Sequence, residues 1–158
     1  MIEIPEAFVL ASQIDENLSG RTVVGVEVPE NPDKFSFYLG DPHEYKRRLT
    51  GSIFSSAGAI GGMVEISADR RRLVFSDGAA PRFYSQDEKP KAKSQLTVKF
   101  GDGSSLSVYV RLYGRLWCFE EGDFDNKYYF VAQEKPSPIS DDFDENYFSK
   151  LFDFEKAD

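Results

Sequence analysis

The chain has 158 residues, 41% of them hydrophobic, which is typical of a single globular domain. Its net charge is −8. Residues 1–119 carry 15 acidic and 15 basic side chains, whereas residues 120–158 carry 12 acidic and 4 basic ones, so the whole excess lies at the C-terminal end. Because duplex DNA is bound by a basic face, this composition excludes the acidic end as such a face but leaves the neutral body open.

The chain contains one cysteine, Cys118, and one histidine, His43. A single cysteine excludes an internal disulfide, and these two side chains are too few for a structural zinc site, which takes about four such ligands. We therefore expect no metal and no cofactor. No stretch reaches the roughly 20 apolar residues of a membrane span, and no secretory signal pattern opens the chain, so we expect a cytoplasmic protein.

The first predicted element is an amphipathic helix over residues 5–18. Pro5 suits the first turn, where its missing N–H costs nothing. Apolar residues then recur at helical spacing up to Leu18, and Gly20 suits the position just after a helix end.

Strands dominate most of the remaining chain. Alternating residues predict a strand over 21–28 and a short one over 35–39. Asp41 and Pro42 suit the N-cap and first position of a short helix that ends near Leu49. The Gly-Asp-Gly sequence at 101–103 predicts a hairpin. Further strands are predicted over residues 53–57, 63–67, 71–75, 82–84, 95–100, 105–111, 116–120 and 127–133.

These elements place the chain in the mainly β (α+β) class. Few predicted strands are long enough for a parallel sheet, which favours an antiparallel β-sandwich or flattened barrel with two helices. Two prolines, at 136 and 138, end the sheet region. They predict a domain over residues 1–135 and an acidic linker over 136–158 that begins a helix. Phe148, Leu151 and Phe152 form an apolar stripe on that helix, for which we expect a partner, either a second copy in a dimer or a further domain.

Six segments follow one another along the chain: E-I-P-E at residues 3–6, L-S-G-R-T-V at 18–23, the L-T-G turn at 49–51, the strand and turn at 96–103, Y-G-R-L-W at 113–117, and residues 136–148. In order and spacing they resemble the N-terminal domain of the formamidopyrimidine-DNA glycosylase and endonuclease VIII family over nearly the whole length. The resemblance implies an eight-stranded β-sandwich flanked by two helices. It also implies base-excision repair of oxidised bases, with damaged DNA as the partner, and a C-terminal helix that enters a helix–two-turn–helix domain.

In this family an N-terminal proline amine attacks the deoxyribose C1′ and forms a Schiff base, while the adjacent Glu moves protons at the sugar. An α-amine suits the attack because a useful fraction of it is unprotonated at neutral pH. Here Ile2 stands at the nucleophile position, and its bulk disfavours removal of Met1. Glu3 and Glu6 match the family pattern, and the resemblance makes Glu3 the candidate acid and base. Because carboxylates also stabilise a helix N-terminus, a structural role stays open for both.

Other functional positions of the family are also changed. The family's hairpin lysine aligns with Gly62, and the methionine wedge that fills the gap left by a flipped base aligns with Gly78. Arg111 and Tyr113 stand for the arginine and the aromatic residue that support this wedge. Arg115 follows in the same motif. We predict DNA contacts at Arg111, Tyr113 and Arg115.

Outside these motifs, structural roles are the better explanation for the charged, histidine and cysteine side chains. The basic runs at residues 70–72 and 89–93 could contact phosphates but are more typical of solvated turns. We expect His43 on the surface and Cys118 buried and inert.

Two functions remain open from the sequence. One is a formamidopyrimidine-DNA glycosylase-like enzyme, with or without lyase activity at abasic sites. The other is a non-catalytic binding or scaffold module built on the same fold, which the joint loss of the amine, the lysine and the wedge favours.

Overall fold

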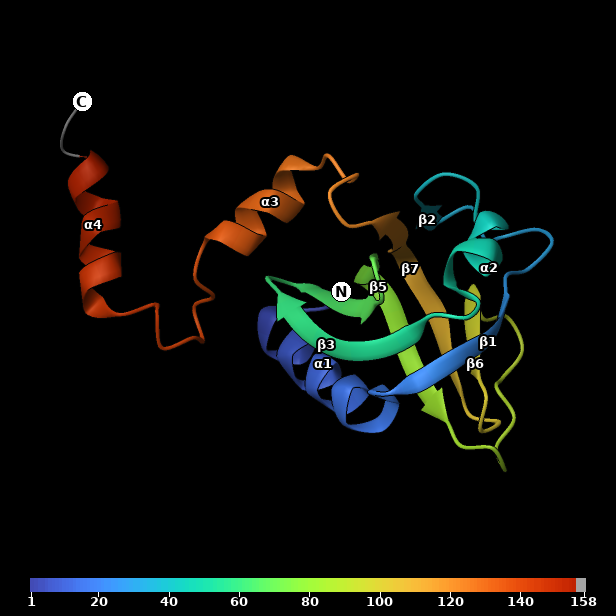
Figure 1. Cartoon of the computed structure of the whole chain (residues 1–158). Coiled ribbons are helices and arrows are strands. Elements are labelled where there is room, and N and C mark those ends of the chain that lie inside the picture. Colours follow the sequence, from blue (N-terminus) through green and yellow to red (C-terminus); the bar gives the residue numbers. More distant parts are fainter. Residues whose placement is uncertain (156–158) are drawn as a thin grey trace. The chain divides into compact units, whose positions relative to one another are not determined.

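The computed structural model describes residues 1–155 (Figure 1). The chain divides into two compact units, the first from Met1 to Asp125 and the second beginning at Asn126. Within the described residues, every strand belongs to the first unit.

The strands of the first unit form one sheet that closes on itself. Their order is β2-β7-β5-β4-β3-β1-β6, and β6 also pairs with β7. Six strands therefore make a closed ring, and β2 lies outside it at the edge. The short β2 runs parallel to β7, whereas the pairings within the ring are antiparallel. The strands are β1 (Arg21–Glu27), β2 (Ser36–Tyr38), β3 (Ile53–Ile60), β4 (Met63–Ala68), β5 (Arg71–Tyr84), β6 (Leu96–Phe100) and β7 (Ser105–Glu120).

Helix α1 (Ile4–Leu18) packs along β3 and β4 (Figure 1). Its buried residues recur at helical spacing, and this apolar face covers the sheet. Pro5 stands in the first turn, as expected, and the Glu3 backbone N–H donates to Oε2 of Glu6 at 3.4 Å. The buried face of α1 consists of Ala7, Ala11, Ile14 and Leu18.

Helix α2 (Glu44–Leu49) begins two residues later than expected. The side chain of Asp41 accepts the His43 N–H at 2.9 Å, so Asp41 caps a turn before the helix instead of the helix itself. His43 is exposed, as expected. Tyr45 is fully buried and its hydroxyl donates to the Leu116 carbonyl at 2.7 Å, which fastens α2 to β7.

The interior of the ring is filled mainly by aromatic and branched aliphatic side chains. Phe54 of β3 and Phe100 of β6 meet edge to face, with 5.1 Å between ring centroids. Cys118 lies in this core, and burial raises the pKa of its thiol to about 11, so it is inert at neutral pH as expected.

The mainly β architecture is confirmed, but the number of strands differs from the eight expected. Over the described residues there are seven strands and four helices. The strands expected over 71–75 and 82–84 are one strand, β5, and those over 105–111 and 116–120 are one strand, β7. Antiparallel pairing between β5 and β7 resumes on both sides of the bulge, so each strand continues through the residues expected to separate two strands.

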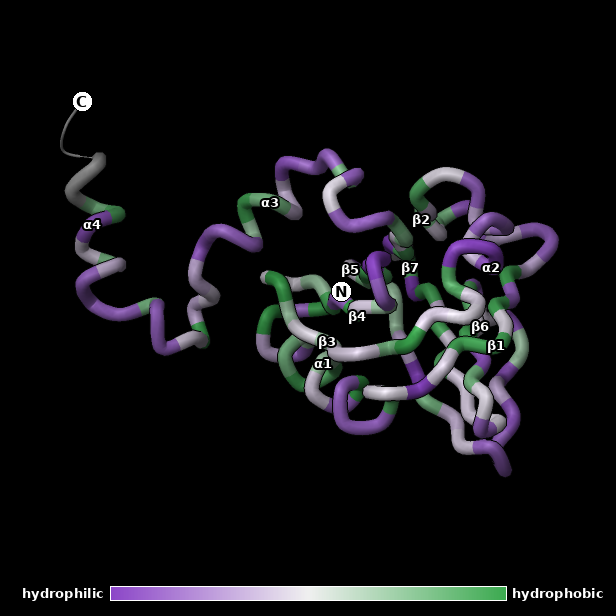
Figure 2. Tube along the Cα trace, viewed as in Figure 1, coloured by the Kyte–Doolittle hydropathy of each residue, from purple (hydrophilic) through white to green (hydrophobic). Residues whose placement is uncertain are grey.

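In the second unit, the prediction of a strand over residues 127–133 was wrong. Helix α3 (Lys127–Glu134) occupies this segment, and the side chain of Asn126 accepts the Tyr129 N–H at 3.0 Å as its N-cap. Helix α4 (Glu145–Glu155) follows the prolines, with hydrophobic residues interspersed among hydrophilic ones (Figure 2). Phe148, Leu151 and Phe152 are all about half exposed. The partner expected for this stripe stays a prediction.

Candidate functional site

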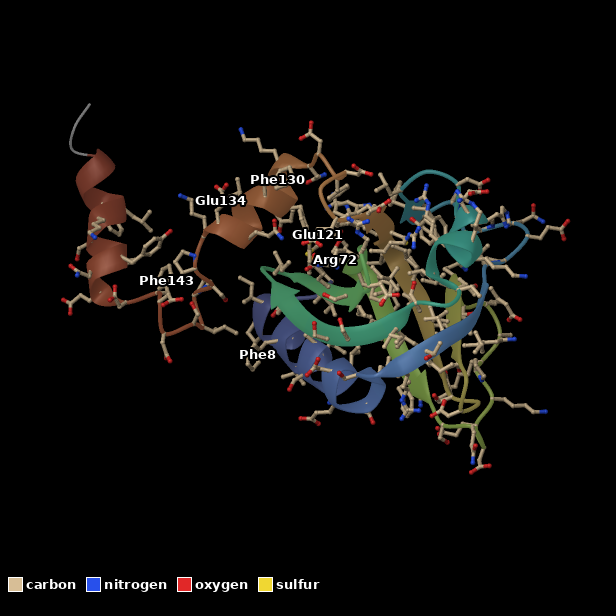
Figure 3. All side chains as sticks on the ribbon, in the orientation of Figure 1. Phe8, Arg72, Glu121, Phe130, Glu134 and Phe143 are labelled. Atoms are coloured by element: carbon tan, nitrogen blue, oxygen red, sulfur yellow. The ribbon has the colours of Figure 1, made fainter. Side chains whose placement is uncertain are left out.

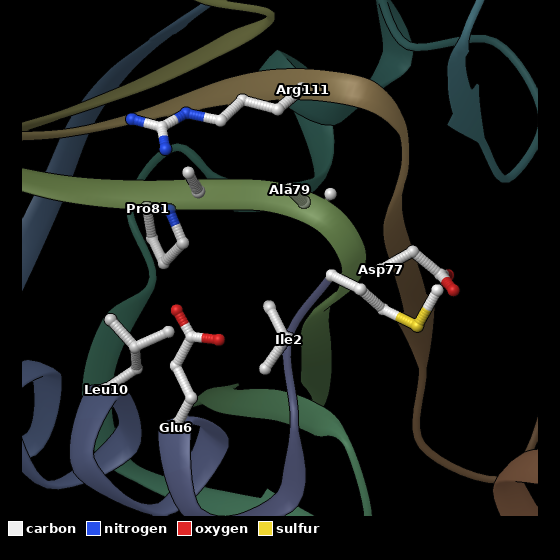
Figure 4. Close-up of a pocket in the computed structure, with 10 residues that line it drawn as sticks. Ile2, Glu6, Leu10, Asp77, Ala79, Pro81 and Arg111 are labelled. Atoms are coloured by element: carbon white, nitrogen blue, oxygen red, sulfur yellow. The ribbon is translucent and has the colours of Figure 1, made fainter.

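A pocket of about 120 Å³ lies where the N-terminus meets β5 and β7 (Figure 4). We call it the N-terminal pocket. It is lined by Met1 and Ile2, by Glu6 and Leu10 of α1, by residues 77–81 of β5, and by Arg111 of β7. Segments distant in the sequence therefore converge on the chain terminus.

Ile2 anchors the terminus to the sheet. Its side chain is buried, and its backbone N–H donates a hydrogen bond to the Asp77 carbonyl oxygen at 2.6 Å. The nitrogen of residue 2 is thus an amide engaged with β5. The α-amine belongs to Met1, which is 78% exposed and also lines the pocket.

The two candidate carboxylates, Glu3 and Glu6, differ in their position relative to the N-terminal pocket. Glu6 lines the N-terminal pocket, and its side chain points from α1 toward Pro81 and Ile2 (Figure 4). Glu3 is exposed and is not among the residues that line this pocket. The structure therefore brings Glu6 together with the terminus, whereas the assignment of Glu3 as acid and base stays a prediction.

The strands β5 and β7 approach each other very closely beside the pocket. A Cβ added at Gly78 would stand 1.8 Å from the Arg111 carbonyl oxygen, so only glycine fits. The pairing register shifts between Asp77 and Ala79, and both Asp77 and Leu112 adopt positive φ, at 60° and 65°. This bulge turns the 111–113 segment outward and leaves Leu112 almost fully exposed.

The hairpin that joins β3 to β4 also reaches the terminus. A Cβ added at Gly62 would stand 3.2 Å from the Ile2 carbonyl oxygen. The position aligned with the family's lysine therefore adjoins the chain terminus, but it carries no side chain here.

The three predicted DNA-contacting residues follow one another along β7. Arg111 lines the N-terminal pocket, and Tyr113 and Arg115 line a separate pocket on the other side of the bulge. Arg115 reaches back to Asp77, with 3.4 Å between Nη1 and Oδ2, and its guanidinium lies over Trp117. Asp77 thus links the two pockets through its backbone and its side chain.

A second pocket, of about 400 Å³, shares Ala80, Pro81 and Arg111 with the N-terminal pocket. We call it the basic pocket, because Arg82, Lys91 and Arg111 line it and no carboxylate does.

Tyr109 completes the basic pocket. Its hydroxyl meets that of Tyr84 at 3.0 Å and donates to the Lys91 carbonyl at 3.1 Å. Desolvation and the hydrogen bond with Tyr84 raise the pKa of Tyr109, so the phenol stays neutral. Three cations and a neutral hydroxyl make a surface suited to an anion such as phosphate.

Several of these residues escaped the sequence interpretation. Leu10 and Pro81 belong to no motif that indicates a functional site, and their place in the pocket depends on which strands meet at the chain terminus. Lys91 belongs to the basic run at 89–93, for which the sequence left phosphate contact open, whereas Arg82 was expected only as the start of a strand. One signal was present at the strand expected over 35–39, since Phe35 and Phe37 alternate there, and both are exposed in the structure.

Among the residues that the structure describes, no group of three or more His, Cys, Asp or Glu side chains is placed to hold a metal ion. No helix in the described part of the chain is long and apolar enough to cross a membrane.

Comparison with solved structures identifies the fold. The chain superimposes on Lactococcus lactis formamidopyrimidine-DNA glycosylase bound to abasic-site DNA, with a TM-score of 0.74, 22% identity, and coverage of 94% of this chain and 55% of that one. A second complex of the same enzyme, with DNA containing formamidopyrimidine-dG, gives a TM-score of 0.74, 22% identity, and coverage of 94% and 56%. MutM bound to DNA with carbocyclic 8-oxoguanine gives a TM-score of 0.73, 24% identity, and coverage of 94% and 56%.

The chain therefore spans about half the length of these glycosylases. No curated protein matches its sequence. Residues 1–115 match the family model of the formamidopyrimidine-DNA glycosylase N-terminal domain. This match covers most of the chain and agrees with the resemblance of its motifs. The chain belongs to the formamidopyrimidine-DNA glycosylase family, whose N-terminal domain its first 115 residues form.

Proposed function

We propose that this domain binds damaged or abasic DNA at the N-terminal pocket and that its own glycosylase chemistry is impaired. The observation that carries the proposal is the hydrogen bond from the Ile2 N–H to the Asp77 carbonyl. An amide nitrogen has no lone pair available for attack on a sugar carbon. The position at which the family carries its nucleophile is therefore a structural anchor in this chain.

The pockets support DNA as the ligand. The basic pocket adjoins the N-terminal pocket, since Arg111 lines both, so a phosphate bound by Arg82 and Lys91 would lie beside the pocket that Glu6 lines. The crystallised glycosylases of similar fold hold abasic or formamidopyrimidine-containing DNA. The acidic excess lies in residues 120–158, outside both pockets.

Binding is tested with a fluorescent duplex that contains one abasic-site analogue. We expect an affinity that falls as salt rises, with a slope of about 0.9 per phosphate contacted. The double variant Arg82→Ala/Lys91→Ala should bind more weakly and with a smaller salt slope. Arg47→Ala is the matched control, since Arg47 is an exposed cation of α2 outside both pockets. Salt-independent binding, or equal losses in both variants, would overturn the proposal.

An active enzyme is the second candidate, favoured because Met1 and Glu6 line the same pocket. The Met1 amine would add to the C1′ aldehyde of an abasic sugar to give a carbinolamine. Glu6 would protonate the departing hydroxyl, and loss of water would leave a C=N bond. Borohydride reduces this bond to a stable amine, which joins protein to DNA.

Borohydride trapping on an abasic-site duplex decides between the two candidates. We expect no adduct from the natural chain. Ile2→Pro should gain an adduct, because proline permits removal of Met1 and then presents a secondary amine at the same position. An adduct from the natural chain that is lost in Glu6→Gln and retained in Glu16→Gln would establish the enzyme instead. Glu16 is the control because it is an exposed carboxylate of the same helix.

A further inference from the structure

The edge strand β2 and its neighbour β7 build an aromatic pocket around two of the predicted DNA-contacting residues, Tyr113 and Arg115. It measures about 440 Å³ and is lined by Phe35, Phe37, Tyr113 and Arg115. We call it the aromatic pocket. Its four residues come from two short stretches, and the pairing of the strands explains why they meet.

The register places all four side chains on one face. Phe37 is the pairing partner of Arg115, and the Phe35 carbonyl accepts the Gly114 N–H at 2.9 Å. Residues two apart on a strand share a face, so Phe35 joins Phe37, and Tyr113 joins Arg115. Tyr38, the residue after Phe37, faces the other way, and its ring packs edge to face on buried Tyr45.

The aromatic side chains remain open to solvent. Phe35 is 46%, Phe37 is 49% and Tyr113 is 40% exposed. The rings of Phe37 and Tyr113 meet edge to face at 70°, with 6.5 Å between centroids, so they do not stack on each other. A contiguous exposed group of large apolar side chains is uncommon on a soluble domain and marks a binding surface.

The charges beside the pocket indicate the chemistry of the ligand. Arg115 is the charged side chain within the lining, and the ammonium of Lys34 lies 4.8 Å from the centroid of the Phe35 ring. The neighbouring carboxylates are engaged. Asp33 accepts the Phe35 N–H, and Asp77 binds Arg115 and accepts from the Ser76 hydroxyl. Flat apolar rings flanked by cations are complementary to a nucleobase attached to a phosphate backbone.

We propose that the aromatic pocket stacks an unpaired base of single-stranded nucleic acid. Arg115 and Lys34 hold the adjoining phosphates, and the ring faces of Phe37 and Tyr113 contact the base. Stacking tolerates any base, because every base offers a π-face, so little sequence preference is expected. The inference rests on the proposed function only in taking nucleic acid as the ligand, because this pocket shares no lining residue with the N-terminal pocket.

The probe is a single-stranded oligothymidylate with one 2-aminopurine, whose fluorescence falls when it stacks on an aromatic ring. We expect quenching with the full chain and an affinity about 10-fold weaker for Phe37→Ala, within the range measured for loss of one stacking contact. Phe8→Ala is the matched control. Phe8 is 60% exposed on α1, points away from the sheet and lies outside the aromatic pocket (Figure 3).

A base-free strand of the same length, built from abasic residues, separates stacking from charge. The protein should bind this strand more weakly than the probe, and Phe37→Ala should not reduce its affinity for the strand further. Equal affinity for the two strands, equal affinity of Phe37→Ala and the natural chain, or capture of an aromatic peptide in place of the probe would overturn the stacking site. If the abasic-site duplex still binds, only this inference fails. If neither nucleic acid binds, the proposed function fails with it.

Discussion

The Ile2 backbone N–H donates to the Asp77 carbonyl oxygen across 2.6 Å, and this bond ties the second residue of the chain to β5 beside the bulge. Chain termini are usually frayed unless something holds them. Here the buried Ile2 side chain adds an apolar anchor to the hydrogen bond. The same contact fixes Met1 and the start of α1 at the edge of the N-terminal pocket.

Ile2→Ala should destabilise the first unit by about 2 kcal/mol, the lower end of the range for truncating a buried isoleucine, because Ile2 lies at the rim of the core. Urea denaturation followed by circular dichroism measures the change. Ile53→Ala is the control. Ile53 is 45% exposed on β3, so this substitution should lower the free energy of unfolding much less. Equal losses in the two variants would show that Ile2 is not an anchor.

Gly78→Ala should be among the most damaging single substitutions in the chain. Its Cβ would overlap the carbonyl oxygens of Arg111 and Tyr113, at 1.8 and 2.4 Å, and backbone atoms of a paired strand cannot move aside cheaply. We expect a loss of about 4 kcal/mol or more.

Gly58→Ala is the matched control for this substitution. It introduces the same methyl group at an exposed position of β3 with no atom within 4 Å. Thermal unfolding should show a large fall in Tm for Gly78→Ala and almost none for Gly58→Ala. A similar Tm for both variants would contradict the close approach of β5 and β7.

Tyr45→Phe removes a buried hydroxyl that several backbone groups share. The hydroxyl donates to the Leu116 carbonyl at 2.7 Å and accepts the Leu39 N–H at 2.8 Å. The substitution leaves these groups without a partner, at a cost of about 1–3 kcal/mol. Chemical denaturation should detect it, whereas Tyr128→Phe, at an exposed position, should change stability by less than about 0.5 kcal/mol.

Cys118 should make the domain sensitive to alkaline pH. Burial raises the pKa of its thiol to about 11, above the value in the unfolded chain, so the fold favours the protonated thiol. This contribution is complete below pH 9 and is lost as pH rises through 11, at up to about 1.4 kcal/mol per pH unit.

Burial likewise raises the pKa of Tyr38 to about 12, which extends the loss to higher pH. Unfolding free energies measured at pH 8, 9 and 10 should fall along this series. The fall should be shallower in Cys118→Ala, whatever the absolute stability of that variant. An unchanged slope in the variant would assign the alkaline loss to other groups.

Local sequence patterns predicted secondary structure well where a single residue or the spacing of apolar residues decides it. Pro5 and the apolar spacing up to Leu18 specify α1, since a helix needs only its own residues to form its hydrogen bonds. The segment at 127–133 failed because Tyr-Tyr-Phe suits a strand or a helix equally, and the N-cap bond from Asn126 settles it in favour of α3. The strands expected to end near Gly78 and Gly114 continue through them, because at each of these positions only glycine lets β5 and β7 approach so closely.

The sequence by itself determined the family, the mainly β class and the substitution of the nucleophile by Ile2, because these are properties of residue identity and order. Only the tertiary structure decided that Glu6 instead of Glu3 lines the pocket, that Arg82 and Lys91 join Arg111, and that Phe35 and Phe37 meet Tyr113. Each of these sets unites residues from strands or helices far apart in the chain. Their meeting depends on the order and register in which the strands pair, which no local pattern encodes.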